Sequence, residues 1–552
     1  MRQTHVAMLS AASVTAVTIF ALSAAVIGQQ GPAGAAKTGA PVFETSDQCQ
    51  ACHNGLTTPR GADASIGIAW RASMMANAAR DPYWHAGVRR EITQHPTAAA
   101  AIEHECSACH MPMMRYEAKA AGGLGGVFAH LPIGAGGTRA HAIAADGVSC
   151  TACHQATPEK LGTRESFNAG FVVAAPSASG ERVAYGPFEV TPGLASVMRS
   201  ATGFVPMQGA HMQSSDLCAT CHTLFTHSLG PDGKVVGELP EQVPYLEWRH
   251  SRYATEKSCQ DCHMKTVPEA MPIASILGEP RQGFRQHDFR GSNFFMPRLL
   301  NKFRHELGVT ALPQELDAAA LLAEEFLRDE AATLSVAAPR VEGGRVMADI
   351  TVENRGGHKL PTAYPSRRAW LHIAVRDARG AVVFESGRLE ASGLIRGNDN
   401  DEDATRYEAH HDEIASPDDV QVYEPILGDP AGAVTTGLIA AVKYLKDNRI
   451  LPHGFDKATA SHDIAVAGQA AADPNFTGGS DRVTLNAPLG GAAGPFTLEV
   501  ELLYQPIGYR WAQNLAPYKA SMEPARFLDY YNAMSAATSA RLAREVVAIQ
   551  QD

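Results

Sequence analysis

The ten cysteines of this 552-residue chain form five pairs, each with two residues between its members, and a histidine directly follows every pair. A structural zinc site usually takes four ligands from two neighbouring pairs, so five pairs would leave one pair unused. Thioredoxin-like redox pairs do not need the histidine. The CxxCH spacing instead matches covalent haem attachment, in which two thiols bond the porphyrin vinyl groups and the adjacent imidazole binds the iron.

The sequence therefore predicts five c-type haems, each with its iron. The cysteines that would form the thioether bonds are Cys49, Cys52, Cys106, Cys109, Cys150, Cys153, Cys218, Cys221, Cys259 and Cys262. The proximal iron ligands would be His53, His110, His154, His222 and His263.

The first 36 residues predict export. Arg2 and His5 precede an apolar run over residues 6–27, and Ala33-Gly34-Ala35 offers a small-residue cleavage site. The run is close to the ~20 residues that span a bilayer, so an uncleaved N-terminal anchor is the alternative and the only membrane contact we expect. Cytochrome c haem is attached outside the cytoplasm, and we expect a periplasmic or cell-surface protein of a bacterium.

The order of sequence patterns predicts an α+β protein with five segments. Residues 37–310 would form a pentahaem cytochrome domain, in which the haems supply much of the buried apolar surface and short helices and loops connect the motifs. A connecting helix at 311–332 would lead to a β-sandwich of immunoglobulin-like kind with helical insertions at 333–510, followed by C-terminal helices at 511–552. Residues 1–36 are the signal peptide or anchor.

The strand predictions depend on alternating apolar residues. They cover residues 345–352, 370–376, 382–385, 420–423 and 496–504, with a hairpin turn at Asp377-Ala378-Arg379-Gly380. We expect helices at 436–445 and 523–547 to interrupt and close the sandwich.

The sixth iron ligands must come from the remaining histidines or from methionine. His141, His211 and His250 precede the first cysteine of a motif by nine, seven and nine residues, and we expect them to serve neighbouring haems. His104 lies two residues before Cys106, so it either binds another iron or is solvated. The competing ligands Met111, Met113, Met114 and Met264 follow proximal histidines, and we expect them to pack against haem edges.

Residues from about 45 to 310, called here the haem-motif region, resemble the multiheme c-type cytochromes related to the tetrahaem cytochrome of ammonia oxidisers. Their wider superfamily includes hydroxylamine oxidoreductase and pentahaem nitrite reductase. The similar segments are His141 ahead of Asp146-Gly147-Val148-Ser149-Cys150, His211 ahead of Cys218, Trp248 upstream of Cys259, and His287-Asp288-Phe289-Arg290-Gly291-Ser292-Asn293. Gly357-His358-Lys359-Leu360-Pro361-Thr362 is similar to a Gly-His-x-x-Pro-Thr loop of multiheme proteins that have a β-domain behind the haems. The resemblance implies that His287 and His358 are distal ligands. Pentahaem nitrite reductases differ by a CxxCK motif at the catalytic haem.

The leading functional prediction is an electron carrier rather than a catalyst, with electrons hopping between low-spin haems that have two histidine ligands. The first alternative is a haem reductase or oxidase of small nitrogen or sulfur compounds at an open iron. The second is a docking or filament protein that acts through the β-domain. The net charge of −11 carries no basic block, so we expect no nucleic-acid partner but redox partners with a basic docking patch. The sequence leaves the oligomeric state open.

An acidic segment predicts a further metal site. Asp399, Asp401 and Asp403 could supply oxygen ligands to Ca²⁺, although the EF-hand pattern fails because Ala404 and His410 stand at its sixth and twelfth positions. A solvated acidic loop is the alternative. We expect His410 and His411 to be surface residues.

Overall fold

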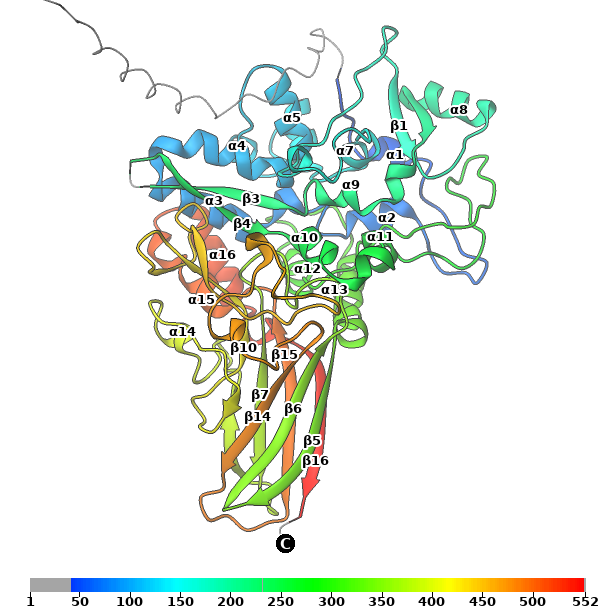
Figure 1. Ribbon diagram of the computed structural model, residues 1–552. Helices are drawn as coiled ribbons and strands as arrows, with labels where there is room; N and C mark the ends of the chain where they lie inside the picture. The colour runs from blue at the N-terminus through cyan, green and yellow to red at the C-terminus, as the bar shows by residue number, and fades with distance from the viewer. Residues whose placement is uncertain (1–40, 231, 551–552) are drawn as a thin grey trace, which may run out of the picture. The chain divides into compact units, whose positions relative to one another are not determined.

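The computed structural model describes residues 41–230 and 232–550 (Figure 1). The predicted signal peptide or anchor therefore lies outside the described residues. Across the part that is described, no helix combines the length and the apolar character needed to cross a bilayer.

The haem-motif region is built from short helices joined by long loops, as the sequence predicts. Each CxxCH segment lies on or runs into a helical turn. The helices are α1 (Asp47–Gln50), α2 (Ile66–Arg71), α3 (Pro82–Gln94), α4 (Ala99–His110), α5 (Pro112–Ala120), α6 (Arg139–Ala145), α7 (Cys150–His154), α8 (Pro192–Thr202), α9 (Ser215–Ala219), α10 (Pro244–Arg249), α11 (Cys259–His263) and α12 (Phe295–Lys302).

Two small sheets in this region were not expected from the sequence. Strands β1 (Arg182–Gly186) and β2 (Phe204–Gln208) pair in parallel, and β3 (Leu224–Leu229) and β4 (Val235–Gln242) form an antiparallel pair. Both pairs lie between CxxCH motifs, where the chain must travel between haem sites.

A helix separates the two kinds of structure, as the proline and leucine pattern predicts. Helix α13 (Pro313–Phe326) begins with proline and is followed by strands. The strands are β5 (Ala332–Glu342), β6 (Arg345–Asn354), β7 (Arg368–Arg376), β8 (Val382–Ser386), β9 (Glu413–Ile414), β10 (Val422–Tyr423), β11 (Pro425–Gly428), β12 (Val434–Thr435), β13 (Lys443–Asp447), β14 (Ser480–Pro488), β15 (Phe496–Gln505) and β16 (Ala540–Ile549).

The longest strands form two sheets (Figure 1). One sheet has the order β10-β7-β15-β16, with β8 also paired to β7, and the other has the order β5-β6-β14-β9. Alternate residues of β15 are buried, as its sequence pattern predicts. The predicted hairpin turn is confirmed, because Asp377 and Ala381 are hydrogen-bonded and β7 pairs with β8. An immunoglobulin-like strand order stays a prediction.

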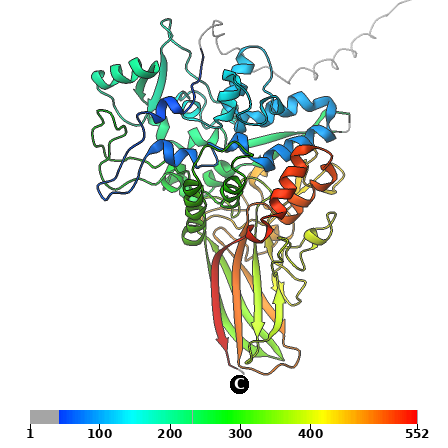
Figure 2. The same cartoon turned by 180° about the vertical axis from the view of Figure 1, so that it is seen from behind.

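One hydrophobic core extends through both regions. It includes Phe294 and Leu299 near α12, Ile350 on β6, and Val500 on β15. The C-terminal helix α16 (Met522–Asn532) also packs on α3, where the rings of Tyr83 and Phe527 lie 4.8 Å apart (Figures 1 and 2). The two regions are therefore joined by side-chain packing as well as by the chain.

Two helix predictions are wrong. Residues 436–445 form a loop with a turn and then enter β13, which pairs with β11. Residues 523–547 form most of α16 and, after a short connection, most of β16. Strand β16 pairs with β15 along its length, from Ala540 opposite Tyr504 to Ile549 opposite Phe496. The hydrogen bonds available at the edge of β15 outweigh the helical preference of the local sequence.

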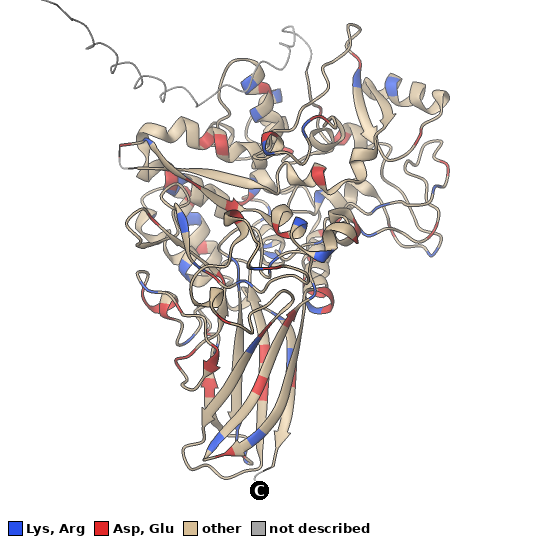
Figure 3. Ribbon diagram, viewed as in Figure 1, with Lys and Arg blue, Asp and Glu red and all other residues tan. Residues whose placement is uncertain are grey.

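Acidic and basic residues are interspersed along the described parts of the ribbon (Figure 3).

On the outer face of β7, His372 lies directly opposite Glu501 of β15. Its Nδ1 is 3.1 Å from Glu501, and its Nε2 is 3.3 Å from Glu385 on β8. Burial opposes protonation, but these two hydrogen bonds outweigh it and raise the pKa of His372.

This cross-strand cluster predicts a pH-dependent contribution to stability. Because the folded pKa of His372 lies above the unfolded value of about 6.5, the contribution is full below that pH and is lost as pH rises through the folded pKa. We expect His372→Gln to lower stability by roughly 0.5–1 kcal/mol at pH 6 and by less at pH 9. Thermal unfolding across a pH series measures it, with the exposed His462→Gln as control. An equal loss at both pH values would contradict it.

Candidate haem-binding sites

The CxxCH segments place their three reactive side chains on one side of a helical turn. The histidine follows the first cysteine by four residues, and residues three and four apart share a helix face. In the first and fourth motifs the backbone N–H of His53 donates to Cys49 and that of His222 to Cys218, each at 3.0 Å. None of the ten cysteines forms a disulfide, so every thiol is available for a thioether bond.

Four proximal histidines are oriented by the backbone. In each, Nδ1 lies at hydrogen-bond distance from a carbonyl oxygen, which fixes the proton on Nδ1 and leaves Nε2 unprotonated to bind a metal. The pairs are His53 with Ile273 at 2.6 Å, His110 with Ala78 at 2.9 Å, His154 with Tyr185 at 2.6 Å, and His263 with Arg290.

Two proximal histidines face a second imidazole. The ring centres of His154 and His287 are 6.4 Å apart with planes inclined by 19°, and those of His263 and His358 are 6.2 Å apart and inclined by 16°. The Nδ1 atoms of His287 and His358 also lie 3.0 and 3.1 Å from backbone carbonyls of Arg285 and Lys359. The second histidine of each pair therefore has the same tautomer as the first.

The separations suit an iron between the two rings. Two metal–nitrogen bonds of about 2 Å, together with about 1.1 Å from each nitrogen to its ring centre, place the ring centres about 6.3 Å apart. Burial lowers the pKa of His287 to about 4 and lowers the pKa of His358 as well. Both rings are thus neutral at pH 7, which is the form that binds a metal. The residues fit axial ligation of haem.

The other four candidates for distal ligation are held differently. Nε2 of His211 lies 2.9 Å from the carbonyl of Ala156, and Nε2 of His250 lies 2.9 Å from that of Asp456. Nδ1 of His104 accepts the backbone N–H of Gly125, which places its proton on Nε2.

Of these four, His141 alone has Nδ1 near a hydroxyl, that of Thr138, and its ring meets His130 edge-on.

Among residues 41–230 and 232–550, no second imidazole faces His53, His110 or His222 at the separation found for the other two motifs.

The methionines after the second motif are buried in a small hydrophobic cluster. Met111 and Met113 are fully buried and Met114 nearly so. The sulfur of Met113 accepts a hydrogen bond from the hydroxyl of Thr151. Packing of these side chains against a haem edge stays a prediction.

The motif thiols lie next to one another across the region. Three pairs of thiols from different motifs lie close enough to shift each other's pKa: Cys49 with Cys150, Cys109 with Cys221, and Cys218 with Cys259. The third and fourth motifs are also neighbours, because Cys153 of the third motif lies near Cys221 of the fourth. Burial and this neighbouring thiol raise the pKa of Cys153 to about 12. The five motifs thus form one connected group.

One contact at the second motif carried no signal in the sequence. The indole of Trp84 lies parallel to the ring of His110, with centres 4.2 Å apart and planes inclined by 3°. Trp84 therefore fixes the ring plane of this proximal histidine. Its position on α3, 26 residues before His110, gives no periodic or motif pattern that could have identified it.

The predicted Ca²⁺ site has its oxygens already engaged. Asp401 is buried, and Arg368 donates to both of its carboxylate oxygens at 2.8 Å. Asp399 pairs with Arg406, and Asp403 accepts from the backbone and hydroxyl of Thr405. Calcium binding at this segment remains a prediction that these contacts do not support.

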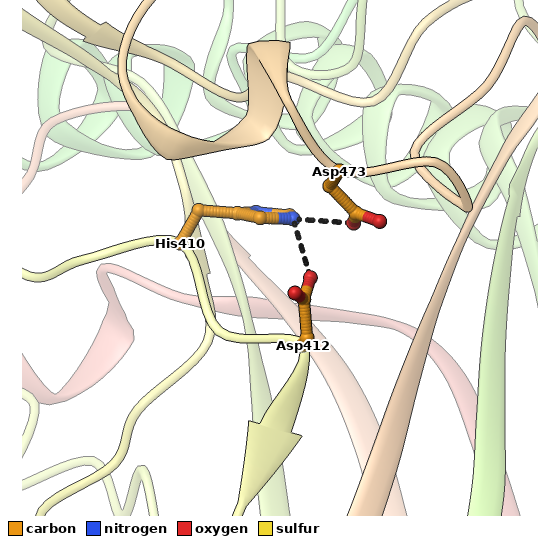
Figure 4. Close-up of side chains that lie close together, drawn as sticks. All are labelled: His410, Asp412 and Asp473. Carbon is orange, nitrogen blue, oxygen red and sulfur yellow. Dashed lines mark hydrogen bonds and ion pairs between the residues drawn. The ribbon is translucent and has the colours of Figure 1, made fainter.

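The prediction of a surface His410 is wrong. The ring is buried, and Nε2 lies 3.1 Å from Asp473 and 3.9 Å from Asp412 (Figure 4). Amide groups of Gln421 and Asn448 donate to Nδ1 at 3.0 and 3.1 Å. Because both nitrogens have partners, a neutral imidazole can be buried here.

His410, Asp412 and Asp473 are the one group of three or more His, Cys, Asp or Glu residues, among those described, whose side-chain atoms lie close enough together to hold a metal ion. Each amide orientation is fixed by a second contact, since Asn448 also donates to Val422 and Gln421 to Asp481. Nδ1 of His410 must then accept, and Nε2 carries the proton. A protonated Nε2 cannot bind a metal, so this donor set does not fit a cation held through His410.

Comparison of the sequence with protein-family models and with curated proteins gives no match. Among solved structures, the chain is similar to a penta-heme cytochrome c552 from Thermochromatium tepidum, with a TM-score of 0.51 and 14% sequence identity. The similarity covers 92% of this chain and 99% of that chain. At this identity the comparison shows the fold, which is that of a multiheme cytochrome.

The contacts of the acidic segment predict that one aspartate substitution lowers stability and that another leaves it unchanged. Asp401→Asn leaves the buried Arg368 without its partner and should lower the free energy of unfolding by about 3–5 kcal/mol. Asp403→Asn removes an exposed carboxylate and should leave the unfolding midpoint unchanged. Thermal unfolding with and without added Ca²⁺ measures both. Stabilisation of the wild-type protein by Ca²⁺ that Asp403→Asn abolishes would restore the calcium prediction.

Proposed function

We propose that this protein is a pentahaem c-type cytochrome that carries electrons in bacterial respiratory electron transfer outside the cytoplasm. The observation that carries the proposal is the pair of facing imidazoles, His154 with His287 and His263 with His358, at the separation that axial ligation requires. Bound haem supplies an iron that accepts and releases one electron at a time.

The protein's own residues support carriage more than chemistry on a substrate. Backbone carbonyls hold the protons of four proximal histidines on Nδ1, and burial keeps the distal imidazoles neutral. An iron held by two of these histidines would offer no position for a substrate, so the residues support transfer of electrons between neighbouring haems. The adjacent thiols of different motifs support this, because four pairs of motifs have neighbouring attachment points.

Export and charge extend the proposal. The apolar N-terminal run and the attachment chemistry of c-type haem support a periplasmic or cell-surface location. The negative net charge, which ionised haem propionates would increase, supports a redox partner with a basic patch.

One observation favours a second candidate function. The proximal residues His53, His110 and His222 lack a facing imidazole within the described part of the chain. An iron with one open position could reduce or oxidise a small nitrogen or sulfur compound. Low-temperature electron paramagnetic resonance of the oxidised wild-type protein separates the two functions, because a carrier has low-spin haems and an open site gives a high-spin signal.

The haem count is the first expected outcome. Five covalent haems should add roughly 3 kDa to the processed chain and leave no free thiol. Intact-mass spectrometry together with thiol titration measures this. Four haems with two free thiols in fully matured protein would contradict it. Cys150→Ala should leave one haem poorly attached and increase proteolysis, because the haem is part of the core.

The distal ligands are the second expected outcome. His287→Ala and His358→Ala should each convert one haem per chain to a high-spin form that binds carbon monoxide, because each removes the imidazole opposite a proximal histidine. His211→Ala and His250→Ala are the matched controls, since their Nε2 atoms face backbone carbonyls. An unchanged low-spin spectrum for His287→Ala or His358→Ala would remove that residue from the ligand set.

A further inference from the structure

His358 lies in a loop of the β-domain that reaches back to the fifth haem motif. The loop follows β6, and Asn354 at the end of that strand donates to the carbonyl of His358 at 2.7 Å. Gly357 lies so close to α10 that a Cβ atom there would be 3.3 Å from Trp248. The backbone of this loop is therefore fitted against the haem-motif region directly before the histidine.

A buried carboxylate of the haem-motif region holds the other side of the loop. Glu247 on α10 accepts the backbone N–H of Lys359 at 3.1 Å and the hydroxyl of Thr362 at 2.5 Å through one oxygen. Its second oxygen lies 3.0 Å from Arg449. One carboxylate thus binds the residue after His358, another residue of the same loop, and a cation on the far side.

The contacts continue as a closed set of four charges. Arg449 donates to both oxygens of Asp447 at 2.8 Å, and the ammonium of Lys359 donates to Asp447 at 2.6 Å. The side chains of Lys359, Asp447, Arg449 and Glu247 are exposed by 0%, 2%, 5% and 0%. Two anions and two cations cancel, so the set is neutral although every member is buried. Removing one member would leave an uncompensated charge out of contact with water.

We propose that Glu247 is a positioning residue for His358, and that the neutral set of Glu247, Lys359, Asp447 and Arg449 fixes this imidazole opposite His263. The set also determines the local charge beside the fifth haem. This rests on the proposed function, because it takes His358 to be an axial ligand.

The test compares Glu247→Gln with the wild-type haem-loaded protein. The variant keeps the shape of the side chain but loses its charge, which weakens the hold on the loop and leaves one positive charge beside the haem. We expect carbon monoxide binding to rise toward one additional haem per chain, and the midpoint potential of one haem to shift in the positive direction. Intact mass must show that all haems are still attached.

Two further variants separate position from charge. Glu247→Gln/Arg449→Met restores neutrality without restoring the contact to the loop, so the potential should return toward wild type while carbon monoxide binding stays raised. Glu256→Gln is the matched control, because Glu256 is an exposed glutamate of the same segment whose ion pair, in the described part of the chain, is with Arg252. It should change neither readout.

The outcomes distinguish this proposal from the proposed function. Wild-type carbon monoxide binding and potential in a fully loaded Glu247→Gln protein would overturn the positioning role, while a high-spin haem in His358→Ala would leave the ligation intact. A low-spin His358→Ala protein would overturn both. If Glu247→Gln fails to fold, Thr362→Val replaces it, since it removes one loop contact without changing any charge. Unchanged carbon monoxide binding there would also overturn the proposal.

Discussion

The hydrogen bond from Nδ1 of a buried imidazole to a backbone carbonyl is the interaction on which the haem sites depend. It fixes the tautomer, so Nε2 carries no proton, and it fixes the ring plane, so that nitrogen points in one direction. His154 and His287 each have this bond, and so do His263 and His358. His410 shows the converse, because amide donors at its Nδ1 place the proton on Nε2 and exclude a metal there.

The sequence predicted the parts of the molecule that local chemistry determines. CxxCH spacing predicts haem attachment because residues three and four positions apart share one face of a helical turn, and the structure gives each motif such a turn. The alternation in β15 identifies a strand with one buried face, and the proline and leucine pattern identifies α13. The facing positions of His287 and His358 were expected only from a family resemblance, since nothing within their own segments specifies a partner more than ninety residues away.

Long-range contacts account for the errors. Residues 540–549 are compatible with a helix until the edge of β15 is available for pairing. His410 is polar and follows an acidic segment, but Gln421, Asn448 and Asp473, which follow it by 11, 38 and 63 residues, come together around its ring. The ion pair of Asp401, which leaves the calcium prediction without support, is long-range too, because Arg368 lies more than thirty residues before it. A short stretch of sequence around His410 or Asp401 therefore does not contain all the residues that these two side chains contact.

The position of His358 has a consequence for the order of events during biogenesis. Synthesis of the chain from its N-terminus presents the motif ending at His263 before His358, which follows it by 95 residues. On the proposed ligation, His263 would be available to the fifth haem before His358 is. His358 would reach its place opposite His263 only when the loop after β6 docks on α10. Completion of the β-domain is then the step that closes the coordination sphere, and an immature chain would be recognisable by an iron still open to small molecules.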